Sequence, residues 1–303
     1  MICRSVASFF LAVSLVAAIA ASTSARDLFV DNLGGDDGNN GQLPTSTPEG
    51  GPVRTINRAL AAALPGDRIV IAKTDQPYRE QISLSAANHS GLNVMPFTIV
   101  GNGAVLDGSA PVPPGGWEFV RKQLYRFRPP RGGYHRLFLG GKPAVRVAVD
   151  AATGRLPATA AEQWFSHEGY IYFATKDESL PRDYDLSYAA LPTGITLYHV
   201  HDVVILDLVV QGFLRDGVNA ADGVRNCRLG GLILRGNGRA GLAVGGSSQV
   251  GCDGMLAGDN GNWQVHVERW ATLSLEDCNL LEGSAPPIAR NGGRLYVDGQ
   301  KQP

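Results

Sequence analysis

The stretch from residue 201 onward decides the fold, because it repeats one short theme four times. The four copies read VVILDLVVQGFLRDGVN (203–219), NCRLGGLILRGNGRAGLAV (226–244), GCDGMLAGDNGNWQVHV (251–267) and LEDCNLLEGSAPPI (275–288). One glycine closes an apolar run in each copy, at steps of 24, 22 and 25 residues: Gly212, Gly236, Gly258 and Gly283. One apolar residue follows at steps of 24, 23 and 23: Val218, Leu242, Val265 and Ile288. A near-constant step of this size predicts stacked units, each of which buries its apolar face only against its neighbours.

Each unit consists of short apolar runs separated by Gly, Asn and Asp, which predicts strands. None holds the roughly 10 to 12 periodic residues that a helix needs, so a leucine-rich repeat is not favoured. A β-sandwich would need hairpin turns and does not predict a constant step. The remaining arrangement is a coil of three short strands per turn, in which each strand pairs with the same strand one turn along.

The N-terminal part adds a second pattern. It runs in the order FVD (29–31), a loop rich in Gly, Asp and Asn, RTINRALAAALPGDRIVIA (54–72), YREQISL (78–84) and FTIVGNGAVLDG (97–108). Together with the repeat, this order resembles the right-handed parallel β-helix proteins of the pectin-lyase-like superfamily, which includes many secreted polysaccharide lyases and hydrolases. The resemblance covers residues 28–108 and 193–300 and is specific for the fold, not for the reaction. It implies an all-β chain.

Four segments are predicted along the chain. Residues 1–25 are expected to be a secretory signal peptide, because Arg4 precedes a short apolar run and small residues before Arg26 offer a cleavage site. Residues 26–110 form the N-terminal cap and first turns, residues 111–192 a β-rich insertion where the period is lost, and residues 193–303 the remaining turns. The signal predicts a protein that is secreted, periplasmic or on the cell surface, with no membrane contact after cleavage.

The clearest predicted helix is Val53–Leu64, which Pro65 and Gly66 end. Ile56, Leu60, Ala63 and Leu64 lie on one stripe of it. A stack of strands ends in an exposed layer of backbone and apolar side chains, so this amphipathic helix is expected to cover the first turn.

The charge of the chain limits the kinds of molecule that it is expected to bind. A net charge of −1 with 18% charged residues argues against nucleic acid as a partner and gives no indication of the oligomeric state.

Removal of the signal leaves Cys227, Cys252 and Cys278, which recur at 25 and 26 residues. We expect them to be free thiols stacked in consecutive turns, with a disulfide between two of them as the minor alternative.

Side chains alternate along a strand, so an outward face can be assigned to the repeat. If Val218, Leu242 and Val265 point inward, then Asn219, Ala243 and His266 form one outward column. Trp263 has the inward parity and is expected in the core or over a turn. The outward face and its edge carry the candidate site residues: Arg215, Asp216, Asn219, Arg239, Gln264, His266 and Glu268.

Different roles are predicted within this set. In an enzyme, His266 or an arginine such as Arg239 would accept the proton, and Asp216 would bind a cation or orient the base. The alternative for His266 is an exposed strand residue that only pairs with Glu268. The substrate-binding residues are expected to be Arg215, Asn219, Gln264 and Glu268.

In the resembled superfamily the outward face is a sugar-binding groove, which implies a polysaccharide as the partner. A lyase of that superfamily often uses Lys or Arg as the base with calcium held by aspartates, but this chain has no lysine between Asp177 and Gln300. A hydrolase needs two carboxylates, and DGVNAAD (216–222) offers only a weak counterpart. No metal site is assigned; Ca²⁺ stays open as a cofactor.

Two hypotheses follow. The first is a secreted carbohydrate-active enzyme, a lyase or a glycoside hydrolase, acting on an extended and potentially acidic polysaccharide. The second is a non-catalytic glycan-binding or cell-surface structural protein.

Overall fold

A computed structural model describes residues 25–150, 152, 154–281 and 285–303. The predicted signal peptide lies outside these residues except for its last position, as does Gly283 of the repeat. Among the described residues no helix is long and apolar enough to cross a membrane.

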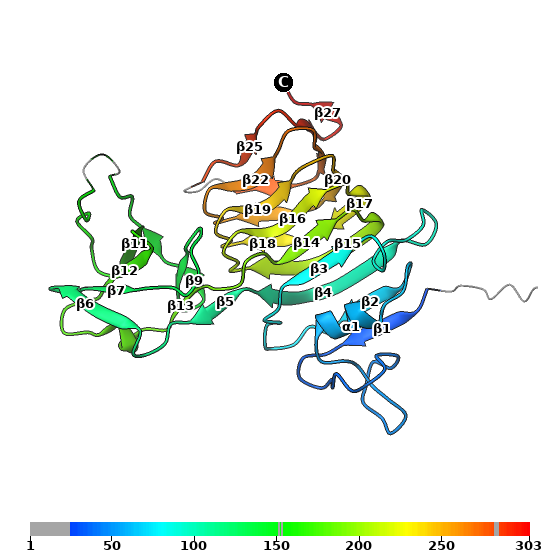
Figure 1. Cartoon of the computed structure of the whole chain (residues 1–303), viewed down its shortest axis with the longest axis horizontal. Helices are drawn as coiled ribbons and strands as arrows, with labels where there is room; N and C mark the ends of the chain where they lie inside the picture. The colour runs from blue at the N-terminus through cyan, green and yellow to red at the C-terminus, as the bar shows by residue number, and fades with distance from the viewer. Residues whose placement is uncertain (1–24, 151, 153, 282–284) are drawn as a thin grey trace, which may run out of the picture.

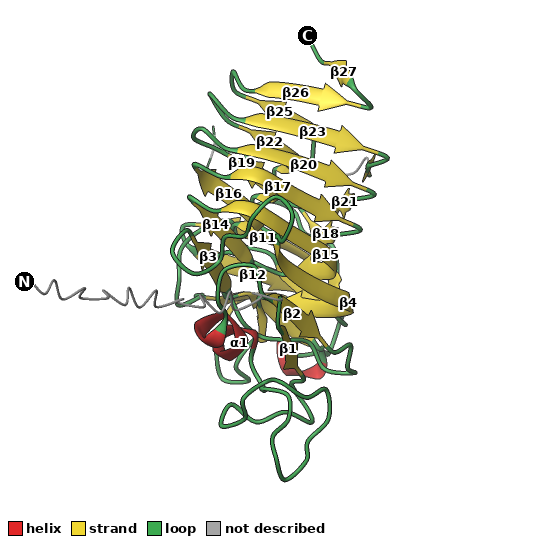
Figure 2. Cartoon of the chain, turned by 90° about the vertical axis from the view of Figure 1, so that its right-hand side faces the viewer, coloured by secondary structure: helices red, strands yellow, loops and turns green. Residues whose placement is uncertain are grey.

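Two large sheets form a coil of stacked turns (Figures 1 and 2). The first, the long sheet, contains twelve described strands, in the paired order β1 (Asp27–Val30), β2 (Arg68–Ile71), β4 (Phe97–Asp107), β15 (His201–Gln211), β17 (Arg225–Gly230), β20 (Gln249–Asp253), β23 (Thr272–Glu276), β26 (Arg294–Val297) and β27 (Gln300–Lys301), with β18 (Ile233–Arg235), β21 (Leu256–Gly258) and β24 (Asn279–Leu280) as a branch from β15. The second, the short sheet, contains β3 (Ile82–Ser85), β14 (Ile195–Tyr198), β16 (Asp216–Asp222), β19 (Ala240–Val244), β22 (Trp263–Val267) and β25 (Ile288–Arg290).

Successive turns pair in parallel, with the register that the repeat predicts. Val218 pairs with Leu242, Leu242 with Val265, and Val265 with Ile288. One core cluster takes buried side chains from both sheets. The prediction of an all-β chain with parallel stacked strands is confirmed, because an inward residue in every turn meets its own counterpart one strand away.

The glycines that close the apolar runs are only partly equivalent. Gly212 and Gly236 have left-handed backbones, with φ of 73° and 63°. Gly258, however, pairs with Arg235, so it lies one position too early, and Asp259 with φ 54° takes the left-handed position. Aspartate tolerates this conformation better than most residues, so the corner does not require glycine.

The N-terminal helix covers the end of the coil, at the opposite end from β26 (Figure 2). It is shorter than predicted: α1 spans Ile56–Ala62 and packs against β1, β2 and β3. Thr55 caps it by accepting a hydrogen bond from the Arg58 amide. Leu64 is 56% exposed and does not join the apolar stripe, because the chain is already extended at Ala63, ahead of Pro65.

The segment between β4 and β14 extends to one side of the coil (Figure 1) and forms two small sheets. One contains β6 (Trp117–Arg121), β7 (Leu124–Phe127), β12 (Tyr170–Ala174), β11 (Gln163–His167) and β10 (Val145–Arg146); the other contains β5 (Ser109–Pro111), β13 (Leu186–Ala189), β8 (Leu137–Leu139) and β9 (Lys142–Pro143). A 3₁₀ turn, η1 (Pro181–Asp183), precedes β13. Trp164 and Tyr172 are buried here, so these aromatic rings build the insertion's own core.

The three cysteines of the described residues are free thiols, but they do not form one column. Cys227 pairs with Val250, whereas Cys252 pairs with Leu229 and is therefore displaced by two residues. Cys278 lies outside the strands and donates its thiol to the Glu276 carbonyl. The predicted stacking is wrong, because the spacing of 25 residues exceeds the step of 23 between paired residues of β17 and β20.

Candidate functional site

The centre of the site is a buried ion pair between two strands of the short sheet. Arg239, just before β19, donates from Nε and Nη2 to the two carboxylate oxygens of Asp216 on β16, at 2.8 and 2.6 Å. The Asp216 side chain is fully buried and that of Arg239 is 11% exposed. The hydrogen bond to Asp216 raises the pKa of Arg239. The roles predicted for Arg239 as a base and for Asp216 as a cation ligand or orienting group stay predictions; in this structure the two side chains bind each other.

Glu268 connects this ion pair to His266. Its Oε1 lies 3.7 Å from Arg239 Nη1 and 3.6 Å from His266 Nδ1. The Glu268 side chain is 42% exposed, which makes it the accessible carboxylate of the group. Gly245 provides its space, because a Cβ there would lie 2.8 Å from Glu268 Oε2. The structure thus brings together four predicted site residues, and Glu268 is the one that solvent and ligand can reach.

His266 is oriented but not exposed. Its ring stacks on Trp263 at a centroid distance of 4.4 Å, and the residue is 5% exposed. Asn291 Nδ2 lies 3.2 Å from Nε2, which accepts when the ring proton is on Nδ1; Nδ1 has no hydrogen-bond partner and lies 3.6 Å from Glu268 Oε1. Burial lowers the pKa of His266, against the opposing effect of Glu268. The prediction of an exposed histidine is wrong because the half-buried Trp263 covers it.

Gln264 belongs to a buried amide ladder and not to a substrate surface. Its Oε1 accepts from Asn260 Nδ2 at 2.8 Å, and Asn260 Oδ1 accepts from Asn237 Nδ2 at 3.0 Å. All three residues are fully buried; Asn237 and Asn260 lie at successive corners of the coil, and Gln264 lies on β22 just after the second corner. The substrate-binding role predicted for Gln264 stays a prediction; here its Oε1 accepts hydrogen bonds from the backbone and side-chain nitrogens of Asn260 inside the turn.

Asn219 and Arg215 lie beside the cluster without joining it. Asn219 is half-buried and occupies the predicted column with Ala243 and His266. Ala243 is buried, so this column leaves less open space than expected. Arg215 is exposed next to Asp216.

Sequence reasoning missed three neighbours. Tyr134 of the insertion is close enough to Arg239 to contribute to the rise in its pKa. Asn291 comes from the following turn, and Trp270, two residues after Glu268, is 73% exposed. The sequence carried a signal only for Trp270, as an aromatic residue in a corner where three other turns have glycine.

No group of three or more His, Cys, Asp or Glu side chains converges on a metal position in the described part of the chain. In the N-terminal loop, Asp37 accepts hydrogen bonds from Arg54 and Thr55, and Asp36 from Gly38, so these carboxylates already serve the turn and the helix cap.

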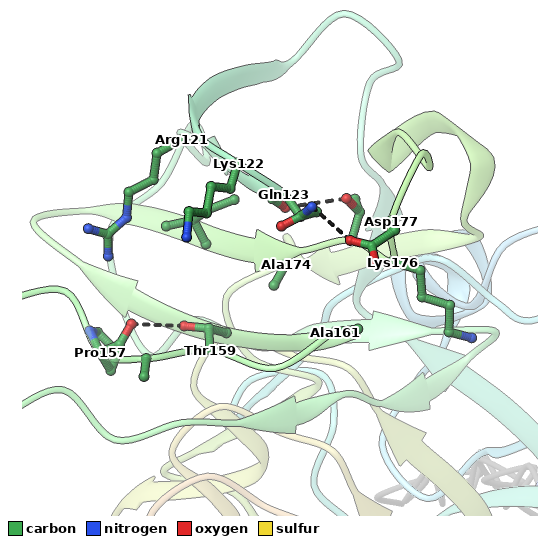
Figure 3. A pocket seen from close by; sticks show the side chains of 12 residues that line it. Arg121, Lys122, Gln123, Pro157, Thr159, Ala161, Ala174, Lys176 and Asp177 are labelled. Atoms are coloured by element: carbon green, nitrogen blue, oxygen red, sulfur yellow. Dashed lines mark hydrogen bonds between the residues drawn. The ribbon is translucent and has the colours of Figure 1, made fainter.

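Among the cavities of the described residues, two involve the insertion and lie away from the cluster. One of about 800 Å³ is in the insertion, where Arg121 and Lys122 face the segment with Pro157 and Thr159 (Figure 3). Another of about 590 Å³ separates the insertion from the coil. It is lined on the coil side by a polar ladder: Asp107 accepts from Gln211 at 3.1 Å, and Gln211 accepts from Arg235 at 2.8 Å.

Comparisons with known proteins fit this architecture. No family model matches the chain, and no curated protein matches its sequence. A solved structure described as "Glycoside hydrolase" is 12% identical with a TM-score of 0.56, covering 91% of this chain and 74% of that one. The chain shares the fold of that structure. At this identity the similarity concerns the fold and not the chemistry.

Two further structures align more loosely. The complex of XylC with xylose is 12% identical with a TM-score of 0.44, covering 90% of this chain and 70% of that one. The pectate lyase Pel9A is 11% identical with a TM-score of 0.43, covering 90% of this chain and 62% of that one.

Proposed function

We propose that the chain is a carbohydrate-active protein that binds an extended polysaccharide across the corner of the short sheet at Glu268. One observation carries the proposal: side chains from separate turns converge there, and one of them, Glu268, is accessible. Parallel stacking places equivalent positions about 4.8 Å apart along a straight face, which suits a polymer better than a compact metabolite. The shared fold with a glycoside hydrolase supports this class of ligand.

The positions of Arg239 and Asp216 give little support to either lyase or hydrolase chemistry. Arg239 is held by Asp216, so an arginine base of the lyase type has no support at this position. Hydrolysis needs two carboxylates on either side of the scissile bond, and Asp216 is fully buried. Binding is therefore the primary function proposed, and secretion stays a prediction.

A second candidate function is an enzyme that uses Glu268 for proton transfer. It is favoured by the position of Glu268 between the imidazole of His266 and the guanidinium of Arg239, an arrangement that orients an exposed carboxylate.

Native electrophoresis in gels that contain polygalacturonate or xylan tests the proposal. We expect one of them to retard the wild-type chain and Glu268→Gln to migrate freely. Glu49→Gln, an exposed carboxylate of the N-terminal loop, is the matched control and should be retarded like the wild type. Retardation in neither gel, or equal retardation of Glu268→Gln, overturns the proposal.

The same polysaccharides separate binding from catalysis. Appearance of unsaturated-sugar absorbance identifies a lyase, and reducing ends without it identify a hydrolase. Retardation without either product leaves the binding function alone.

A further inference from the structure

From β14 to β25, each turn of the coil leaves the short sheet through a corner that contains one residue with a left-handed backbone. These residues are His199, Gly223, Gly246, Trp270 and Gly292, with φ of 54°, 63°, 54°, 72° and 90°. Hydrogen bonds from Arg225 to Val200 and from Arg294 to Ala271 show that neighbouring corners stack. Glycine takes this conformation without steric cost, whereas a bulky aromatic residue is a genuine outlier there.

The Trp270 side chain makes few packing contacts that could offset the strain of its backbone. It is 73% exposed, so most of the indole makes no contact with the core. Its defined partner is Arg269, whose guanidinium carbon lies 4.8 Å from the ring centroid. The stem of Arg269 runs beside Gly292 at the next corner. Packing therefore does not explain why a tryptophan stands at this corner.

Position and chemistry offer an explanation. Trp270 follows Glu268 by two residues, so it lies at the edge of the proposed binding site. Arg269 orients the indole from one side by a cation–π contact and leaves apolar ring surface exposed. Trp263 cannot serve in the same way, because its ring is stacked on His266.

We infer that Trp270 is a stacking platform for a sugar ring of the polysaccharide that contacts Glu268. The inference rests on the proposed function and adds a binding position to it. The apolar C–H face of a pyranose lies on the indole face opposite Arg269, while the carboxylate of Glu268 takes its hydroxyls. An indole fixed in advance loses little conformational freedom on binding, so the exposed tryptophan contributes affinity rather than stability.

The test is whether replacing Trp270 weakens polysaccharide binding without lowering the stability of the fold. Trp270→Gly should weaken binding to the retarding polysaccharide, polygalacturonate or xylan, at least fivefold, while its thermal midpoint stays equal or rises. Trp270→Phe should retain part of the affinity. The control is Glu168→Gly, which removes an exposed left-handed residue (φ 49°) from the insertion. It should also keep or raise the midpoint, with unchanged binding.

Each failure has a separate meaning. If Trp270→Gly binds like the wild type while Glu268→Gln does not, the platform is wrong and the proposed function stands. A fall in the midpoint of Trp270→Gly shows a structural role and also overturns the inference. If neither polysaccharide binds the wild type, the proposed function has failed and the platform fails with it.

Discussion

Arg239 holds both carboxylate oxygens of Asp216, one strand away, at 2.8 and 2.6 Å. This pair stabilises the corner of the coil on which the proposed site is built. Because it is buried, substituting either residue disturbs the fold as well as the site. Asp216→Asn and Arg239→Ala are consequently poor probes of catalysis, although the sequence alone presents them as such.

We expect Asp216→Asn to lower the free energy of unfolding by about 3–5 kcal/mol, because it leaves a buried guanidinium without its main partner. Denaturant unfolding measures the change. The control is Asp253→Asn, which breaks the exposed pair with Arg228 at 2.6 Å and should change the free energy by less than about 1 kcal/mol. Equal effects of the two substitutions would contradict the structural role of the buried pair.

Stability should fall as the pH drops below neutral. Burial lowers the pKa of His266, and burial together with Arg146 lowers the pKa of His135. A folded-state pKa below the unfolded value of about 6.5 means that the unfolded chain binds these protons first. Their contribution is complete above that pH and is lost as the pH falls through the lowered pKa values.

Unfolding in urea between pH 8 and pH 5 checks this dependence. Each histidine contributes at most about 1.4 kcal/mol per pH unit to the slope. His266→Gln and His135→Gln should each flatten it. A slope that both variants leave unchanged would refute the assignment.

Thiol reactivity should follow burial. Burial raises the pKa of Cys227 to about 12 and also raises that of Cys252, so neither should react with an alkylating reagent in the native chain from residue 26 onward. Without reductant, mass spectrometry after unfolding should find three alkylated cysteines, including Cys278. A single alkylated cysteine would show a disulfide and contradict the free thiols.

The column of inward residues Val218, Leu242 and Val265 should not tolerate a charged side chain. Leu242 is fully buried between Val218 and Val265, so Leu242→Asp is expected to cost several kcal/mol and to unfold the chain at ambient temperature. Leu242→Met keeps the volume and should cost less than about 1.5 kcal/mol. Circular dichroism during thermal unfolding distinguishes the two. A folded Leu242→Asp variant would place this residue outside the core.

The sequence anticipated the side of the strand on which each candidate site residue lies, but not what surrounds that residue. Parity placed His266 on the outward side correctly, but parity carries no information on what covers a side chain. Trp263 supplies that cover from the start of the same strand. Gln264 has the same outward parity as His266, yet the turn recruits its amide into the ladder with Asn260.

The sequence by itself determined the stacked all-β coil and its inward column. Both follow from a period of two along each strand and a nearly constant step between turns, which are one-dimensional patterns. It also placed a helix before the first turn, although not its ends. The tertiary structure alone decided which side chains pair, are covered or stay accessible. In the structure Asp216 and Arg239 form an ion pair, Cys227 and Cys252 do not pair, and Glu268 stays exposed. Each of these outcomes depends on an offset of one or two residues between adjacent turns. The summed lengths of the corners set such offsets, and no local pattern specifies them.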